Sequence, residues 1–196
     1  MPKSWSGSPG VLPIRSISLG LKGVGEVIPG GLVTSSVNPI DIARAMSPIM
    51  EALGRGNFPI QFPTGYTGWQ GGLQYIWDPI WVDELAAIFP DVPIVLAKIG
   101  RGFRTSFDTC VVVAARNANV YLEMTETPSE FVREAVQRIG AERIMFGTDL
   151  SAISLNYAYE LGFRDLNGAG LNAEELEWIA WRTANKVYQL GLEGCG

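Results

Sequence analysis

The sequence predicts an α/β fold with a mostly parallel sheet, because strand-like runs alternate with amphipathic helical patterns along the chain. Five apolar, β-branched runs are each followed by a helical pattern, at residues 17–28, 59–62, 92–97, 119–124 and 143–146. No hairpin turns join these runs, and parallel strands need helical crossovers between them. The alternation alone leaves open whether the sheet is wound open or rolled into a barrel.

Three helix starts carry capping signals. Asn38-Pro39-Ile40-Asp41 supplies an N-cap, a proline at the first helical position and an acid in the first turn. Thr127-Pro128-Ser129-Glu130 and Asn172-Ala173-Glu174-Glu175 both have the spacing of a capping box. The last of these is predicted to open a final helix that continues through Leu190.

Composition limits the class of protein. The chain has 196 residues, of which 47% are hydrophobic and 18% charged, and this predicts one globular domain with a sizeable core. Its net charge of −5, with scattered Lys and Arg, argues against nucleic acid or a membrane surface as a partner. Small molecules or other proteins are expected instead. No apolar run approaches the roughly 20 residues of a membrane span or forms a signal peptide, so a cytoplasmic location is the default expectation.

Histidine is absent from the chain. This removes the usual ligand of a hydrolytic metal and the usual base at neutral pH. Cys110 and Cys195 lie in separate segments, so neither a disulfide scaffold nor a cysteine zinc site is predicted. We therefore expect no metal and no cofactor.

Three charged residues follow strand-like runs and are the candidate catalytic residues. Asp149 ends the run Arg143-Ile144-Met145-Phe146-Gly147-Thr148-Asp149, Glu26 lies among glycines near the end of the first run, and Lys98 follows the third run. Ligands of α/β proteins bind at the carboxyl ends of strands. Structural alternatives remain: Asp149 as a helix cap, Glu26 as a solvated acid, and Lys98 as an ion-pair partner. A catalytic role for Lys98 would be that of a base or a Schiff-base nucleophile.

The loops after the second and third runs hold the candidate substrate-binding residues. Arg101 and Arg104 could bind a substrate carboxylate in the fork geometry of arginine, or could be solvated loop charges. Tyr66 and Trp69 could line a pocket for a ring-bearing substrate, or could pack in the core. Thr64, in the same loop, completes the candidate set.

Several segments, taken in order, resemble the later strands of the amidohydrolase-related barrels. They are residues 22–26, 58–65, 89–100, 119–123 and 143–149, and residues 185–191 look like the closing helix of that family. The resemblance covers residues 17–192, which we take as an amidohydrolase-like domain, and residues 1–16 are expected to be irregular. It implies a partial (β/α) TIM-type barrel of about five βα units. It also implies a hydrolase of C–N or C–O bonds, or a related decarboxylase, acting on small ring-bearing or carboxylated substrates.

The chain departs from the family at the metal site. The family opens with a His-x-His strand, and this chain begins after the expected place of that strand and the next two. The family usually has His where Pro63 and Lys98 stand, so only Asp149 of the metal set remains. A protonated lysine has no lone pair. The standard metal site is therefore expected not to form.

Three functional hypotheses follow. The first is a hydrolase or decarboxylase in which Asp149 activates water or shuttles a proton. The second is an inactive binding or scaffold subunit, and a Schiff-base lyase through Lys98 is a more distant third. A partial barrel also leaves sheet edges and an apolar face uncovered, which predicts a homo-oligomer or a partner chain.

Overall fold

The structure is a computed structural model that describes residues 17–29, 38–67, 74–149 and 155–193. Four parallel strands form one sheet in the order β1-β2-β3-β4. They are β1 (Ile60–Pro63), β2 (Ile94–Ala97), β3 (Val120–Glu123) and β4 (Ile144–Met145). This arrangement confirms the predicted α/β fold and four of the five strand positions.

The first predicted strand is only partly correct. Ile17 and Ser18 lie in a helical turn, and Val24 alone forms a bridge, parallel to β1. The chain nevertheless follows β1, because Val24 N donates to Pro59 O (3.0 Å) and Val27 N donates to Gln61 O (2.9 Å). Glycines around Val24 explain the irregularity, since glycine weakens a strand and often marks a close approach of two backbones. A Cβ on Gly25 would lie only 2.6 Å from the Cβ of Gln61.

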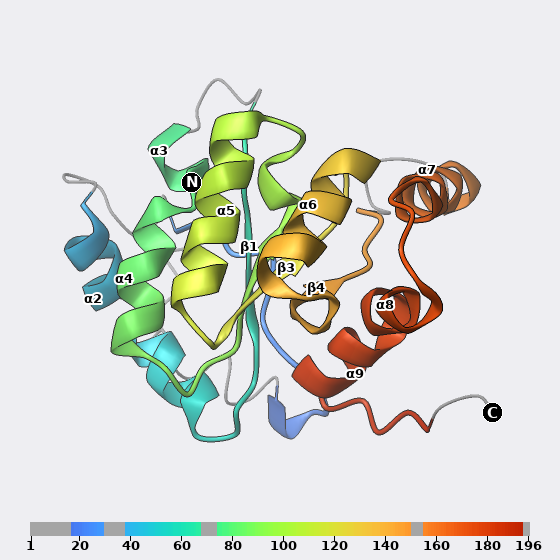
Figure 1. The fold of residues 1–196 in the computed structure, drawn as a ribbon. Helices are drawn as coiled ribbons and strands as arrows, with labels where there is room; N and C mark the ends of the chain where they lie inside the picture. Colours follow the sequence, from blue (N-terminus) through green and yellow to red (C-terminus); the bar gives the residue numbers. More distant parts are fainter. Residues whose placement is uncertain (1–16, 30–37, 68–73, 150–154, 194–196) are drawn as a thin grey trace.

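Helices cover one face of the sheet. Figure 1 shows α4, α5 and α6 side by side over the strands, and α2 packs against α4. The strand side chains that point toward these helices, such as Ile94, Leu96 and Leu122, are fully buried. The helices on this side are α2 (Pro39–Gly54), α3 (Gln74–Trp77), α4 (Ile80–Ile88), α5 (Arg104–Arg116) and α6 (Ser129–Ile139).

Two of the three predicted caps are confirmed. The Asn38 side chain accepts from Asp41 N (2.9 Å), and Asn172 and Glu175 form a reciprocal capping box. The box predicted at Thr127 is wrong, because Pro128 is the N-cap residue and makes no side-chain cap bond. The Thr127 hydroxyl is instead fully buried, 3.1 Å from the carbonyl oxygen of Lys98. The Thr127 side chain therefore makes a tertiary contact with Lys98 and does not form the helix cap that the local sequence predicts.

The last helices lie at the β4 edge of the sheet, where α7 packs against α6, and α9 reaches the other, inner face. They are α7 (Leu155–Gly168), α8 (Ala173–Glu177), a π-helical turn (Trp178–Arg182) and α9 (Thr183–Val187), so the regular helix ends before Leu190. Phe146 N, just after β4, donates to Ile179 O (2.8 Å). Val187 packs against Val95, Tyr121 and Met145 on the inner face of the sheet. The inner face is therefore covered in part by this chain itself.

None of the helices within the described residues combines the length and the apolar character needed to cross a bilayer.

Candidate active site

A buried lysine lies between two carboxylates at the carboxyl edge of the sheet. Lys98 directly follows β2, and its Nζ lies 2.8 Å from Oε1 of Glu26 and 3.1 Å from Oδ2 of Asp149. Its side chain is 4% exposed, whereas those of Glu26 and Asp149 are 33% and 27% exposed. The structure thus brings together the three residues that the sequence selected, and Lys98 forms the ion pairs given above as its structural alternative.

Unusual backbone conformations position two of these residues. Lys98 has a φ of +74°, Ile99 of +34° and Asp149 of +46°, all in the left-handed region. Such conformations cost about 1–3 kcal/mol each in residues other than glycine, so surrounding contacts must hold them. Around Lys98 these contacts are the bond from its N–H to Oε2 of Glu123 (3.2 Å) and the contact of its carbonyl with Thr127.

The ionisation state of Lys98 follows from its surroundings. Burial lowers the pKa of Lys98, but hydrogen bonds and charges from Glu26 and Asp149 outweigh it, so the pKa lies above its ordinary value. The side chain is therefore an ammonium at neutral pH, without a lone pair. This argues against Lys98 as a Schiff-base nucleophile or a general base.

Glu123 is a site residue that the sequence reasoning missed. It ends β3 level with Ala97 of β2, is only 6% exposed, and accepts hydrogen bonds at both carboxylate oxygens. Burial raises the pKa of Glu123, although hydrogen bonds from Thr125 and Lys98 oppose the shift. An acid at the end of an otherwise apolar strand was the available signal.

These residues line a pocket of about 450 Å³, which we name the Lys98 pocket. Glu26, Lys98, Glu123 and Asp149 contribute its charged groups, and Tyr188, which directly follows α9, also lines it. The Tyr188 hydroxyl donates to Oε1 of Gln61, another lining residue (3.1 Å). Burial, followed by the charge of Glu123, raises the pKa of Tyr188 to about 12, so the phenol stays protonated. The described lining thus holds one cation and three acids.

The predicted substrate-binding residues lie elsewhere. Thr64 is buried, and its hydroxyl donates to Ala97 O (2.8 Å) and accepts from Gly100 N (2.9 Å). The half-exposed ring of Tyr66 packs on Phe103 with centroids 4.3 Å apart. Both residues join loops to each other and neither lines the Lys98 pocket. Trp69 lies outside the described residues.

Both candidate arginines are held by acids of the protein. Arg101 Nε lies 2.6 Å from Glu126, and Arg104 Nη1 lies 2.8 Å from Glu134. Arg104 also stacks over the ring of Phe131. Glu134 belongs to α6, and neither guanidinium lines the Lys98 pocket. A substrate carboxylate held by these arginines in this pocket is not supported.

Parallel strands, outer helices and a charged pocket at the carboxyl edge define a protein built on the α/β-barrel plan. The family model for amidohydrolases matches residues 14–190, so the chain belongs to the amidohydrolase family.

Solved structures show the same fold. An uncharacterized TIM-barrel protein from Bordetella bronchiseptica aligns with a TM-score of 0.68 at 19% identity, over 89% of this chain and 59% of its own. A candidate 2-pyrone-4,6-dicarboxylic acid hydrolase from Pseudomonas putida aligns with a TM-score of 0.59 at 15% identity, over 96% of this chain and 71% of its own. Amidohydrolase 2 from Bifidobacterium longum subsp. infantis aligns with a TM-score of 0.57 at 14% identity, over 94% of this chain and 77% of its own. The chain therefore spans about three-fifths of the Bordetella barrel. No curated protein matches the sequence.

The metal implied by the family does not fit this pocket. Pro63 has no donor atom in its side chain, and Lys98 is a cation whose Nζ already contacts both Glu26 and Asp149. Across the described parts of the chain, no group of three or more His, Cys, Asp or Glu side chains could hold a metal ion. A fixed ammonium thus lies where the resemblance places a metal ligand.

Proposed function

We propose that the protein hydrolyses a C–N or C–O bond of a small, uncharged or cationic substrate in the Lys98 pocket, without a bound metal. The observation that carries this proposal is the buried Lys98 ammonium held between two carboxylates at the carboxyl edge of the sheet. A preorganised hydrogen-bond donor beside a carboxylate base is the combination that acyl hydrolysis needs.

Each group has a stated role in the proposed reaction. Glu26 and Asp149 take two of the three N–H donors of the ammonium, and the third donates to the substrate carbonyl oxygen. Asp149 accepts a proton from a water molecule, whose oxygen attacks the carbonyl carbon. The ammonium stabilises the negative charge that develops on the carbonyl oxygen. The proton then passes from Asp149 to the leaving nitrogen or oxygen as that bond breaks.

The charges of the pocket support an uncharged or cationic substrate. Its described lining sets one ammonium against Glu26, Glu123 and Asp149, so an anion would meet an excess of negative charge. One structural neighbour is described as a hydrolase of a dicarboxylic acid. We do not extend that substrate to this chain, because the ammonium is already paired and Arg101 and Arg104 lie outside the lining.

Replacement of Asp149 tests the proposal. We expect the parent, after dialysis against a chelator, to hydrolyse a neutral member of a panel of aryl esters, anilides and lactones. Asp149→Asn should lower kcat about 10²–10⁴-fold, because it removes the general base. Asp108→Asn, which alters an acid in surface ion pairs with Arg104 and Arg138, is the matched control and should leave kcat unchanged. Activity that requires added metal, or a panel turned over equally by parent and Asp149→Asn, would contradict the proposal.

A ligand-binding subunit without catalysis is the second candidate. It is favoured by the ion pairs of Lys98 with Glu26 and Asp149, because the buried ammonium already has partners of opposite charge when no substrate is bound. Saturable binding of neutral amides in the Lys98 pocket, with no turnover of any panel member, would support this candidate over the hydrolase.

A further inference from the structure

A second pocket adjoins the Lys98 pocket. It has a volume of about 310 Å³ and lies between the loop after β3 and helix α7, and we name it the Leu161 pocket. Thr125, Gly147 and Thr148 line both pockets. The two cavities therefore meet at the carboxyl ends of β3 and β4.

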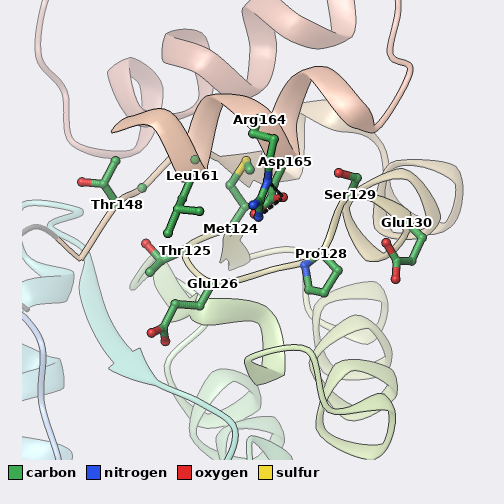
Figure 2. Close-up of a pocket in the computed structure, with 12 residues that line it drawn as sticks. Met124, Thr125, Glu126, Pro128, Ser129, Glu130, Thr148, Leu161, Arg164 and Asp165 are labelled. Carbon is green, nitrogen blue, oxygen red and sulfur yellow. Dashed lines mark hydrogen bonds and ion pairs between the residues drawn. The ribbon is translucent and has the colours of Figure 1, made fainter. Parts of the chain in front are cut away.

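Apolar groups line part of the Leu161 pocket. Two of the three acids in its lining are paired within the protein, and the third, Glu130, makes no ion pair with the described residues. Figure 2 shows Leu161 reaching toward Thr125, and Met124 also lines the pocket. The acid Asp165 pairs with Arg164 (2.9 Å), as the dashed lines of Figure 2 show, and Glu126 pairs with Arg101 (2.6 Å). A ligand group in this pocket therefore meets methyl and methylene groups and hydroxyls more than an unpaired charge.

Gly147 lies at the junction of the two pockets. A Cβ at this position would lie 1.6 Å from Oε1 of Glu123, so no side chain can occupy this space while Glu123 holds its place. The same carboxylate accepts the backbone N–H of Lys98. The contact that orients the Lys98 loop therefore requires a residue without a side chain at the junction.

We propose that the two pockets form one two-part site for an elongated, uncharged substrate. The reacting carbonyl lies in the Lys98 pocket, and an alkyl or aryl group extends past Thr125 and Gly147 into the Leu161 pocket. The position of the reacting end rests on the proposed hydrolase function, whereas the shape and charge preference rest on the pockets alone. The excess of acids in the Lys98 pocket disfavours an anionic end group.

Methionine methyl groups report on each pocket separately. Met124 lines the Leu161 pocket and Met145 lines the Lys98 pocket, while Met46, on the buried face of α2, is fully buried and serves as the internal reference. The full chain labelled with [¹³C-methyl]methionine would be titrated with acetamide, hexanamide and hexanoate. These probes differ in length at constant chemistry and in charge at constant length, and release of ammonia would report any hydrolysis of the two amides during the titration.

We expect acetamide to shift the Met145 signal alone, and hexanamide to shift Met124 and Met145 with one dissociation constant. Hexanoate should bind at least about tenfold more weakly than hexanamide, because juxtaposed like charges cost free energy. Leu161→Trp should fill the second pocket, abolishing the Met124 shift while Met145 still responds. Leu19→Trp, at a 78% exposed position outside both linings, should behave as the parent.

Other outcomes separate the two proposals. A hexanamide titration that shifts Met145 only, or neither methyl group, would overturn the two-part site. Equal binding of hexanoate and hexanamide would overturn its charge preference. If both methyl groups respond as expected but no ester, anilide or lactone is hydrolysed, the hydrolase proposal fails and the two-part binding site stands.

Discussion

Lys98 is the single residue on which the candidate site depends, because it is the only cation among the described residues of the pocket lining. Lys98→Met should leave Glu26, Asp149 and Glu123 near one another without a neutralising charge. We expect the free energy of unfolding at pH 8 to fall by about 2–3 kcal/mol. This is less than the about 3–5 kcal/mol lost when a fully buried ion pair is broken, since the two paired carboxylates are partly exposed. The measurement is the urea midpoint.

The same variant should also change the pH dependence of stability. Like-charge repulsion raises the pKa of carboxyl groups in the folded variant above their unfolded values. Such groups stabilise the fold at low pH and lose that contribution as pH rises, so the deficit relative to the parent should widen between pH 4 and pH 8. Lys22→Met, at an exposed position, is the control. Parallel profiles for Lys98→Met and the parent would mean that the three acids do not interact with Lys98.

In the parent, the raised pKa of Lys98 makes the stability of the fold depend on pH in the alkaline range. Its folded pKa lies above the unfolded value, so its stabilising contribution is complete below the unfolded pKa of about 10.4 and declines as pH rises through the folded value.

At the scale of elements, the start of α6 distinguishes a local cap from a tertiary contact. Thr127→Val should cost about 1–2 kcal/mol, because it leaves the buried carbonyl of Lys98 without its hydroxyl partner. Glu130→Ala should change the free energy of unfolding by less than about 0.5 kcal/mol, because the exposed Glu130 closes no capping box. Thr127→Ser is the matched control, since it keeps the hydroxyl. If urea denaturation gave equal losses of unfolding free energy for Thr127→Val and Glu130→Ala, the result would contradict this prediction and indicate a capping box.

At the scale of the whole molecule, the segment beside β1 carries exposed apolar side chains. Leu19, Leu21 and Ile28 are 78%, 55% and 42% exposed, and they flank the residues that pair with β1. Such surfaces favour association between copies, so we expect a dimer or larger species. Leu21→Lys should weaken it, whereas Val112→Lys on α5 should not. A light-scattering mass near 21.3 kDa for the parent would contradict this prediction.

Strand-end positions were readable because the carboxyl ends of parallel strands meet at one edge. Glu26, Lys98 and Asp149 were selected in this way, and the ion pairs join them. Glu123 obeys the same rule and was overlooked, because it was read only as part of a strand. The substrate-binding candidates were chosen from loop composition, which contains no information on the direction of a loop. Contacts with Glu126 and Glu134 hold Arg101 and Arg104 outside the Lys98 pocket.

The sequence by itself determined the α/β class, four strand positions, the caps at Asn38 and Asn172, and the absence of imidazole ligands, because periodicity, capping residues and composition act locally. Tertiary structure decided what depends on contacts between distant segments. These are the packing of α9 on the inner face, the hydrogen bond from Thr127 to Lys98, the arginine ion pairs outside the Lys98 pocket and the close approach of Gly147 to Glu123. Residues far apart in the chain meet only when the sheet is assembled, and burial then sets which charges pair and how they ionise.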